Sequence, residues 1–165
     1  MKREKSLSRQ ELIKRIDRLF QACRRYDGAW KKNGQWYNRC VTSGMVLPIE
    51  KIQAGHWIPR GCYATRWDPT NCNPQSAHDN LYKSGAYIEY SHWYIEKYGM
   101  EKYEQMIQTY SLHKQGKIPA FKMDEIREKY DFWLEKGRAL EKKVGPLFPK
   151  TWKKFGPDFI TSQEP

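Results

Sequence analysis

The chain has 165 residues, and its 30 Lys and Arg residues against 19 Asp and Glu residues give a formal net charge of +11 at pH 7. This length fits one compact domain with extensions. The charge favours a polyanionic partner, with nucleic acid first, over an acidic small molecule. No run of about 18 apolar residues is present and the N-terminus lacks the form of a secretory signal, so we expect a cytoplasmic protein without a membrane partner.

Four cysteines lie unevenly along the chain, at positions 23, 40, 62 and 72. They are too few for the disulfide scaffold of a small secreted protein. We therefore expect reduced thiols.

The first predicted element is a basic amphipathic helix over residues 8–25. It opens with Ser8-Arg-Gln-Glu11, which has the form of a capping box, and its apolar residues then recur on one face. The opposite face carries Arg18, Arg24 and Arg25, which predicts contacts with a phosphate backbone; a solvated charged face is an equally good interpretation. We assign residues 1–28 to this unit.

Short segments separated by turn residues follow the helix and predict β-hairpins. Asn33-Gly34 is one of the turn signals between them. The next segment, from Pro59 to Pro74, is rich in turn residues and predicts an irregular loop that is pinned at both ends. These segments belong to a predicted core over residues 29–98.

Helical patterns dominate the remainder of the chain. They run over residues 81–98, 100–114 and 122–143. The helices beyond the core form a predicted extension over residues 99–145. A basic and aromatic tail over residues 146–165 contains Lys153, which either binds the DNA backbone or solubilises the tail.

One histidine and two asparagines follow the order of a ββα nuclease site. In that arrangement a His at the end of one strand faces a helix that holds a divalent ion, and the His removes a proton from the attacking water. An Asn in the connecting loop fixes the tautomer of the imidazole. Here these residues are His56, Asn71 and Asn80. A buried strand histidine is the plain alternative for His56.

Several motifs around these three residues occur in a fixed order between residues 19 and 98. They are Cys40-Val-Thr-Ser-Gly44, Gln53-Ala-Gly-His-Trp-Ile-Pro-Arg-Gly61, Thr65-Arg-Trp-Asp68, Asn71, Gln75, Asn80, Ser84-Gly85 and Glu89-Tyr90. Together they resemble the phage NinG (Rap) recombination-endonuclease family, an HNH-like group. The resemblance implies an α+β fold with a ββα-metal, treble-clef-like core. It also implies hydrolysis of branched DNA, such as Holliday junctions or D-loops, with Mg²⁺ or Mn²⁺.

The resemblance assigns roles to individual residues. It implies that His56 is the general base, that Asn71 orients it, and that Asn80 lies with His56 on the metal side. Arg60 and Arg66 match basic positions of the family, where guanidinium groups suit contacts with phosphate. Two strands of a junction must be cut, so we also expect a homodimer.

The chain departs from the family pattern at the structural zinc. The pattern has two Cys-x-x-Cys pairs, but this chain has Cys40-x-x-Ser43 and Ser76-x-x-Asp79. Ser is a poor ligand for a tetrahedral zinc site, so we expect no structural zinc. A replacement site made of Cys40, Cys72, His78 and Asp79 is not supported by spacing.

Two alternatives remain at this point. The main alternative to an endonuclease is a catalytically weakened relative that binds DNA or assists assembly. The other alternative is a purely structural interaction module. For the aromatic residues between Tyr87 and Tyr98, a helix core is the main interpretation and base stacking by one or two of them is the lesser one.

Overall fold

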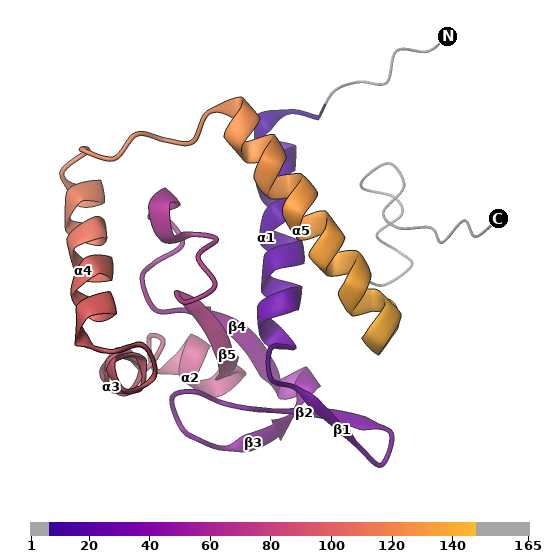
Figure 1. Ribbon diagram of the computed structural model, residues 1–165. Coiled ribbons are helices and arrows are strands. Elements are labelled where there is room, and N and C mark those ends of the chain that lie inside the picture. The colour runs from indigo at the N-terminus through magenta and orange to yellow at the C-terminus, as the bar shows by residue number, and fades with distance from the viewer. Residues whose placement is uncertain (1–6, 148–165) are drawn as a thin grey trace, which may run out of the picture.

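The computed structural model describes residues 7–147 (Figure 1). The helices are α1 Arg9–Arg25, α2 Ala77–Tyr82, α3 Tyr87–Tyr98, α4 Met100–Lys114 and α5 Met123–Val144, with two 3-10 turns, η1 Ile49–Lys51 and η2 Tyr63–Thr65. The strands are β1 Trp30–Lys32, β2 Gln35–Arg39, β3 Val46–Pro48, β4 Ile52–His56 and β5 Cys72–Ser76. The predicted α+β class is therefore confirmed. None of the helices in residues 7–147 combines the length and the hydrophobicity that a membrane crossing needs.

Helix α1 forms as its sequence predicts. The Ser8 side chain accepts a hydrogen bond from the Glu11 amide, and the Glu11 carboxylate accepts one from the Ser8 amide at 2.8 Å. The apolar face of α1 is buried and packs against α5, which lies beside it (Figure 1). The two helices approach closely because Gly137 has no side chain: a Cβ there would lie 2.6 Å from Leu19 Cδ2.

Two small antiparallel sheets follow. In the first, β1, β2 and β3 are neighbours in that order, and the Asn33-Gly34 turn between β1 and β2 has positive φ at both residues. In the second, β4 pairs with β5 so that His56 lies opposite Cys72 and Gln53 lies opposite Gln75. We call this pair the β4–β5 ribbon; α2 follows it directly in the chain.

Two predicted boundaries were wrong. Strand β5 begins at Cys72, inside the segment that we expected to be irregular up to Pro74. Its polar residues find hydrogen-bond partners in the interior that a sequence pattern does not reveal. The helix predicted over residues 81–98 is interrupted between α2 and α3. Ser84, Gly85 and Ala86 all have positive φ there, and a helix cannot continue through that conformation.

The buried residues fall into clusters on both sides of the ribbon. On one side, residues from α1 and α5 pack against Trp67 and Cys72. On the other side, Trp57 packs against α3 and α4, with the Trp57 and Tyr94 rings stacked at a centroid distance of 4.3 Å. The ribbon therefore lies between two packed layers, and each of its faces meets a different environment.

Candidate functional site

His56 lies at the end of β4 and is half-buried beside α1. The centroid of its ring is 5.8 Å from that of Phe20. Its Nε2 atom is 2.9 Å from the main-chain oxygen of Arg66. A carbonyl oxygen only accepts hydrogen bonds, so a neutral imidazole in this position carries its proton on Nε2. The lone pair is then on Nδ1, which is the atom that can take a proton.

The surroundings of His56 favour this neutral form. Burial is the main influence and lowers the pKa of the imidazole, and the charge of Arg60 lowers it further. The hydrogen bond to the Arg66 carbonyl and the charge of Asp17 act in the opposite direction, but the pKa remains below its ordinary value. His56 is thus unprotonated near neutral pH, as a general base must be.

Asn71 is fully buried and holds the loop between β4 and β5. Its Nδ2 donates to the carbonyls of Ile58 and Thr65, both at 3.0 Å, and its Oδ1 accepts from the Ile58 amide at 2.8 Å. These bonds use the whole amide, so Asn71 does not bond to the imidazole directly as we expected. It instead fixes the loop next to Arg66, whose carbonyl does contact His56.

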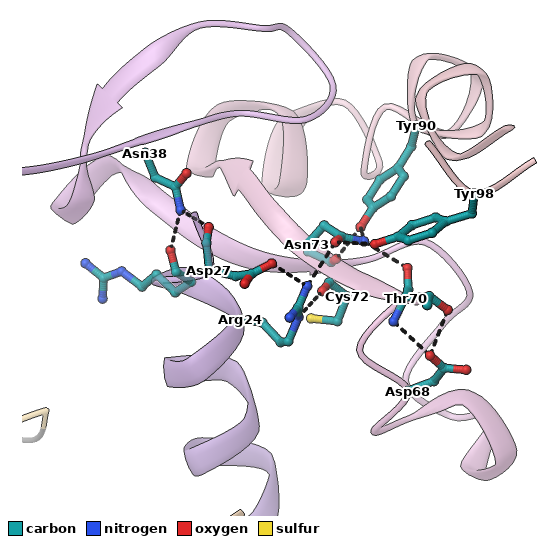
Figure 2. A network of polar contacts seen from close by, with 11 residues as sticks. Arg24, Asp27, Asn38, Asp68, Thr70, Cys72, Asn73, Tyr90 and Tyr98 are labelled. Atoms are coloured by element: carbon teal, nitrogen blue, oxygen red, sulfur yellow. Dashed lines mark hydrogen bonds and ion pairs between the residues drawn. The ribbon is translucent and has the colours of Figure 1, made fainter. Parts of the chain in front are cut away.

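Two arginines that we expected on DNA are held inside the protein. Arg66 donates from Nε and Nη2 to the two carboxylate oxygens of Asp17, at 2.8 and 2.6 Å. Arg24 donates to the Cys72 carbonyl at 2.7 Å and to Asp27 and Asn73 at 3.0 and 3.1 Å (Figure 2). Their guanidinium groups join parts of the fold, and the phosphate contacts of Arg66 and Arg24 stay predictions.

The other predicted DNA contacts have different positions. Arg18 and Arg25 line a groove of about 520 Å³ between α1, β4 and α2. Arg25 also donates twice to the Ile49 carbonyl, which holds its guanidinium group in place. Arg60 is exposed in the loop after β4. Lys153 lies outside the described residues.

Asn80 lies in the same groove as Arg18 and Arg25. Its Nδ2 donates to Gln53 Oε1 at 2.7 Å, and no other side-chain hydrogen bond of Asn80 occurs within residues 7–147. This leaves its amide oxygen, Oδ1, as a ligand for a cation. The groove thus unites a predicted metal-side residue with two predicted DNA contacts.

His56 and Asn80 do not meet. Gln53, whose Oε1 accepts the hydrogen bond from Asn80, is three residues before His56 on β4. The side chains of Gln53 and His56 therefore point to opposite faces of the strand, and their Cα atoms are about 10 Å apart along it. Among residues 7–147, no three His, Cys, Asp or Glu side chains are grouped so that they could hold a metal.

The residue before His56 is Gly55. A Cβ at this position would overlap Gln75 Oε1, so any larger residue here would force the Gln75 side chain to move. Gln75 is fully buried and donates from Nε2 to the Gly85 carbonyl at 2.7 Å. Its Oε1 has no hydrogen-bond partner in the described part of the chain.

Three of the four positions of the two Cys-x-x-Cys pairs, Cys40, Ser76 and Asp79, meet at the start of α2 together with Thr42. We call Cys40, Thr42, Ser76 and Asp79 the knuckle cluster. Thr42 donates to Asp79 Oδ2 at 2.6 Å, the Ser76 amide donates to Cys40 Sγ at 3.1 Å, and the Asp79 amide donates to Ser76 Oγ at 3.0 Å. Direct hydrogen bonds thus join the β2–β3 turn to α2. Cys72, a member of the replacement zinc set, lies instead in the cluster beside α1.

The charge of Asp79 is stabilised within this cluster. Burial raises the pKa of its carboxyl, but hydrogen bonds from Thr42, His78, Lys83 and Cys40 outweigh burial and lower the pKa to about 2. Asp79 is therefore ionised at neutral pH. Its ion pair with Lys83 Nζ, at 3.3 Å, supports the same state.

Sequence reasoning did not identify the partners that position His56. The main-chain carbonyl of Arg66 has no side-chain signature, so only the structure reveals it. Asp17 has a weak signal, because it is an acid within the apolar positions of α1. Trp67 Nε1 also donates to Asp17, at 2.9 Å, which explains why that carboxylate is buried.

One family comparison covers most of the chain. The family model described as Bacteriophage Lambda NinG protein matches residues 1–143. No curated protein and no solved structure matches. The chain belongs to the NinG family of phage recombination-associated proteins.

Proposed function

We propose that this protein is a metal-dependent DNA endonuclease of the HNH type that hydrolyses phosphodiester bonds in branched recombination intermediates. The observation that carries the proposal is the geometry of His56. Its Nε2 lies 2.9 Å from the Arg66 carbonyl, and burial keeps the pKa of the ring low. Nδ1 of a neutral, oriented imidazole can remove the proton from a water that attacks phosphorus. Membership of a phage recombination family supports branched DNA, such as a Holliday junction or a D-loop, as substrate.

The cation in this proposal is Mg²⁺ or Mn²⁺. Asn80 Oδ1 is an oxygen of the type that these ions prefer, and it faces the basic groove. When bound, the ion would polarise the phosphate and stabilise its developing charge. With no cluster of three His, Cys, Asp or Glu residues in residues 7–147, DNA phosphate and water would supply most ligands. Metal affinity should therefore rise when DNA is present.

The substrate backbone would lie along the groove. Arg18 and Arg25 line it, and the exposed Arg60 lies in the loop after His56. Contacts between guanidinium groups and phosphate release counterions, so affinity should fall steeply with salt. Cleavage of two strands of a junction would require two sites, which a homodimer provides.

A DNA-binding or assembly protein with weakened catalysis is the second candidate. One observation favours it: the side chains of Gln53, which bonds to Asn80, and of His56 point to opposite faces of β4. An ion at Asn80 and a water activated by His56 would then act on the same phosphate only if the groove closes on DNA. A protein that binds DNA without this closure would not cut it.

Cleavage of labelled DNA distinguishes the two candidates. A four-way junction, a D-loop and plain duplex are incubated with Mg²⁺ or Mn²⁺, and the native protein is compared with His56→Ala. His92→Ala is the matched control, because His92 is exposed on α3. We expect the His56 variant to lose about 10²-fold or more in rate and the control to keep it. Tight binding without cutting by the native protein would favour the second candidate.

A further inference from the structure

A second cavity, of about 390 Å³, lies between the end of α1, the β2–β3 turn and α3. We call it the aromatic pocket; its lining includes Trp30, Trp93, Tyr98, Arg39, Lys97 and Asp27. We propose that it binds one unpaired nucleotide of a DNA substrate and does not distinguish the four bases. This inference rests on the proposed DNA substrate but not on cleavage.

Aromatic side chains form the walls of this pocket. Trp30 is 39% exposed, and Trp93 and Tyr98 are half-buried with their rings edge to face at a centroid distance of 5.8 Å. Aromatic faces stack with any unpaired base, because every base has a π-face. The volume lies within the range of small-ligand sites.

Basic side chains lie at the rim of the aromatic pocket. Arg39 and Lys97 are exposed, and neither forms an ion pair within residues 7–147. Arg39 Nη1 donates to the Gly44 carbonyl at 2.8 Å, which holds its guanidinium group at the pocket. Among residues 7–147, Asp27 is the only carboxylate that lines the pocket, and it is paired with Arg24 at 3.0 Å. A phosphate next to a stacked base would therefore meet two cations.

The two amides that line the pocket are already occupied. Asn73 donates from Nδ2 to the Thr70 carbonyl and to Tyr90 Oη, and its Oδ1 accepts from Arg24 and Tyr98 (Figure 2). Asn38 donates to the carbonyls of residues 25 and 27, and its Oδ1 accepts from the Arg39 amide. Bases are distinguished by hydrogen bonds to their edges. The NH₂ donors and the carbonyl oxygens of both amides are already hydrogen-bonded within the protein. The pocket should therefore recognise an unstacked base and not its identity.

The aromatic pocket is close to the basic groove. Arg25 lines the groove, Asp27 lines the pocket, and the Asn38 amide bonds to the carbonyls of both residues. Both cavities therefore lie near the end of α1, and a strand that leaves the groove there would continue toward the pocket. Base pairs of plain duplex keep their bases stacked, whereas unpaired sites expose them. The pocket would in this way favour branched DNA over duplex.

The test measures binding without catalysis. Fluorescence anisotropy in EDTA compares a duplex that contains one unpaired nucleotide with the same duplex in which that nucleotide is abasic. We expect the native protein to bind the base-containing DNA between about 5- and 150-fold more tightly, since stacking contributes about 1–3 kcal/mol per base. Exchanging the unpaired base among A, C, G and T should change affinity less than about threefold.

Substitutions test whether the pocket causes the difference in affinity between base-containing and abasic DNA. Trp93→Ala and, separately, Trp30→Ala should abolish the difference between base and abasic site, and Trp93→Phe should retain it. Phe132→Ala is the matched control, because Phe132 is 50% exposed on α5 and does not line the pocket. An unchanged difference in both Ala variants, no difference in the native protein, or a strong preference for one base would overturn the proposal. Because EDTA prevents cleavage, an inactive nuclease would leave this result unaffected.

Discussion

The two faces of the β4–β5 ribbon differ sharply. The face toward α1 presents Ala54, His56 and Cys72 to an apolar layer that contains Phe20. The opposite face presents polar side chains, including Asn73, to α2 and α3. On the first face the His56 ring packs against apolar side chains and has the Arg66 carbonyl as its hydrogen-bond partner, and on the second almost every polar group is hydrogen-bonded.

The apolar face therefore affects the protonation of His56, whereas the polar face holds the ribbon in position. The apolar face lowers the pKa of His56 by burial and so provides a neutral base. The polar face fixes the ribbon, because Tyr90 Oη donates to the Gly55 carbonyl at 2.9 Å and accepts from Asn73 at 3.1 Å. Changes on the first face should therefore alter the titration of His56, and changes on the second should mainly alter stability.

The largest effect should come from Phe20→Ala on the apolar face. Phe20 is fully buried, so its truncation should lower the free energy of unfolding by about 3–5 kcal/mol. Water would then reach the imidazole and raise the pKa of His56 toward its ordinary value. Urea unfolding and an NMR titration of His56 measure the two effects. A stable variant with an unchanged His56 pKa would remove the proposed role of this face.

Gly55→Ala tests the polar face by overpacking. The new Cβ would overlap Gln75 Oε1, which should lower the free energy of unfolding by about 1–3 kcal/mol. Gln75→Ala in the same chain should relieve part of this loss, because the overlapping atoms are removed. Urea unfolding of the single and double variants checks the coupling. Additive losses would show that the two residues do not share this space.

The knuckle cluster should make stability depend on acid pH. The pKa of Asp79 is about 2 in the fold and about 3.9 in an unfolded chain, so its charge stabilises the fold above pH 4. This contribution, about 2 kcal/mol, should be lost as pH falls toward 2. Urea unfolding across this range should show a smaller decline in Asp79→Asn than in the native protein. Equal declines would place the acid sensitivity elsewhere.

Tyr90→Phe should have the smallest effect. It removes only the hydroxyl that joins Gly55 and Asn73, and the free energy of unfolding should fall by about 1–1.5 kcal/mol. The pKa of His56 should not change, because its ring is on the other face. A shift of that pKa in Tyr90→Phe would show that the two faces are coupled.

The apolar face was largely predictable from the sequence, and the polar face was not. The capping box at Ser8 and the periodicity of α1 identify the helix that covers His56, and Asn33-Gly34 identifies the first hairpin. Strand β5 was missed because the Asn73 amide and the Nε2 group of Gln75 find partners outside the strand, such as Tyr90 and Gly85. Local patterns do not contain such partners.

The same limit applies to the candidate site. His56 and Asn80 were recognised from motifs, but the partner of the imidazole is a main-chain carbonyl, which every residue has. The basic helix face predicted a phosphate contact for Arg24 and the family resemblance predicted one for Arg66, yet both side chains have partners inside the fold. A sequence shows the charge of an arginine but not the carboxylate that it meets after folding.

The central claim is that the apolar face holds His56 as a neutral base with its proton on Nε2. Long-range ¹H–¹⁵N NMR of the imidazole at pH 7 tests it most directly, because protonated and unprotonated ring nitrogens have well-separated shifts. The account predicts a protonated Nε2, an unprotonated Nδ1 and a titration midpoint below the ordinary value for histidine. A proton on Nδ1, or a charged ring at pH 7, would contradict it.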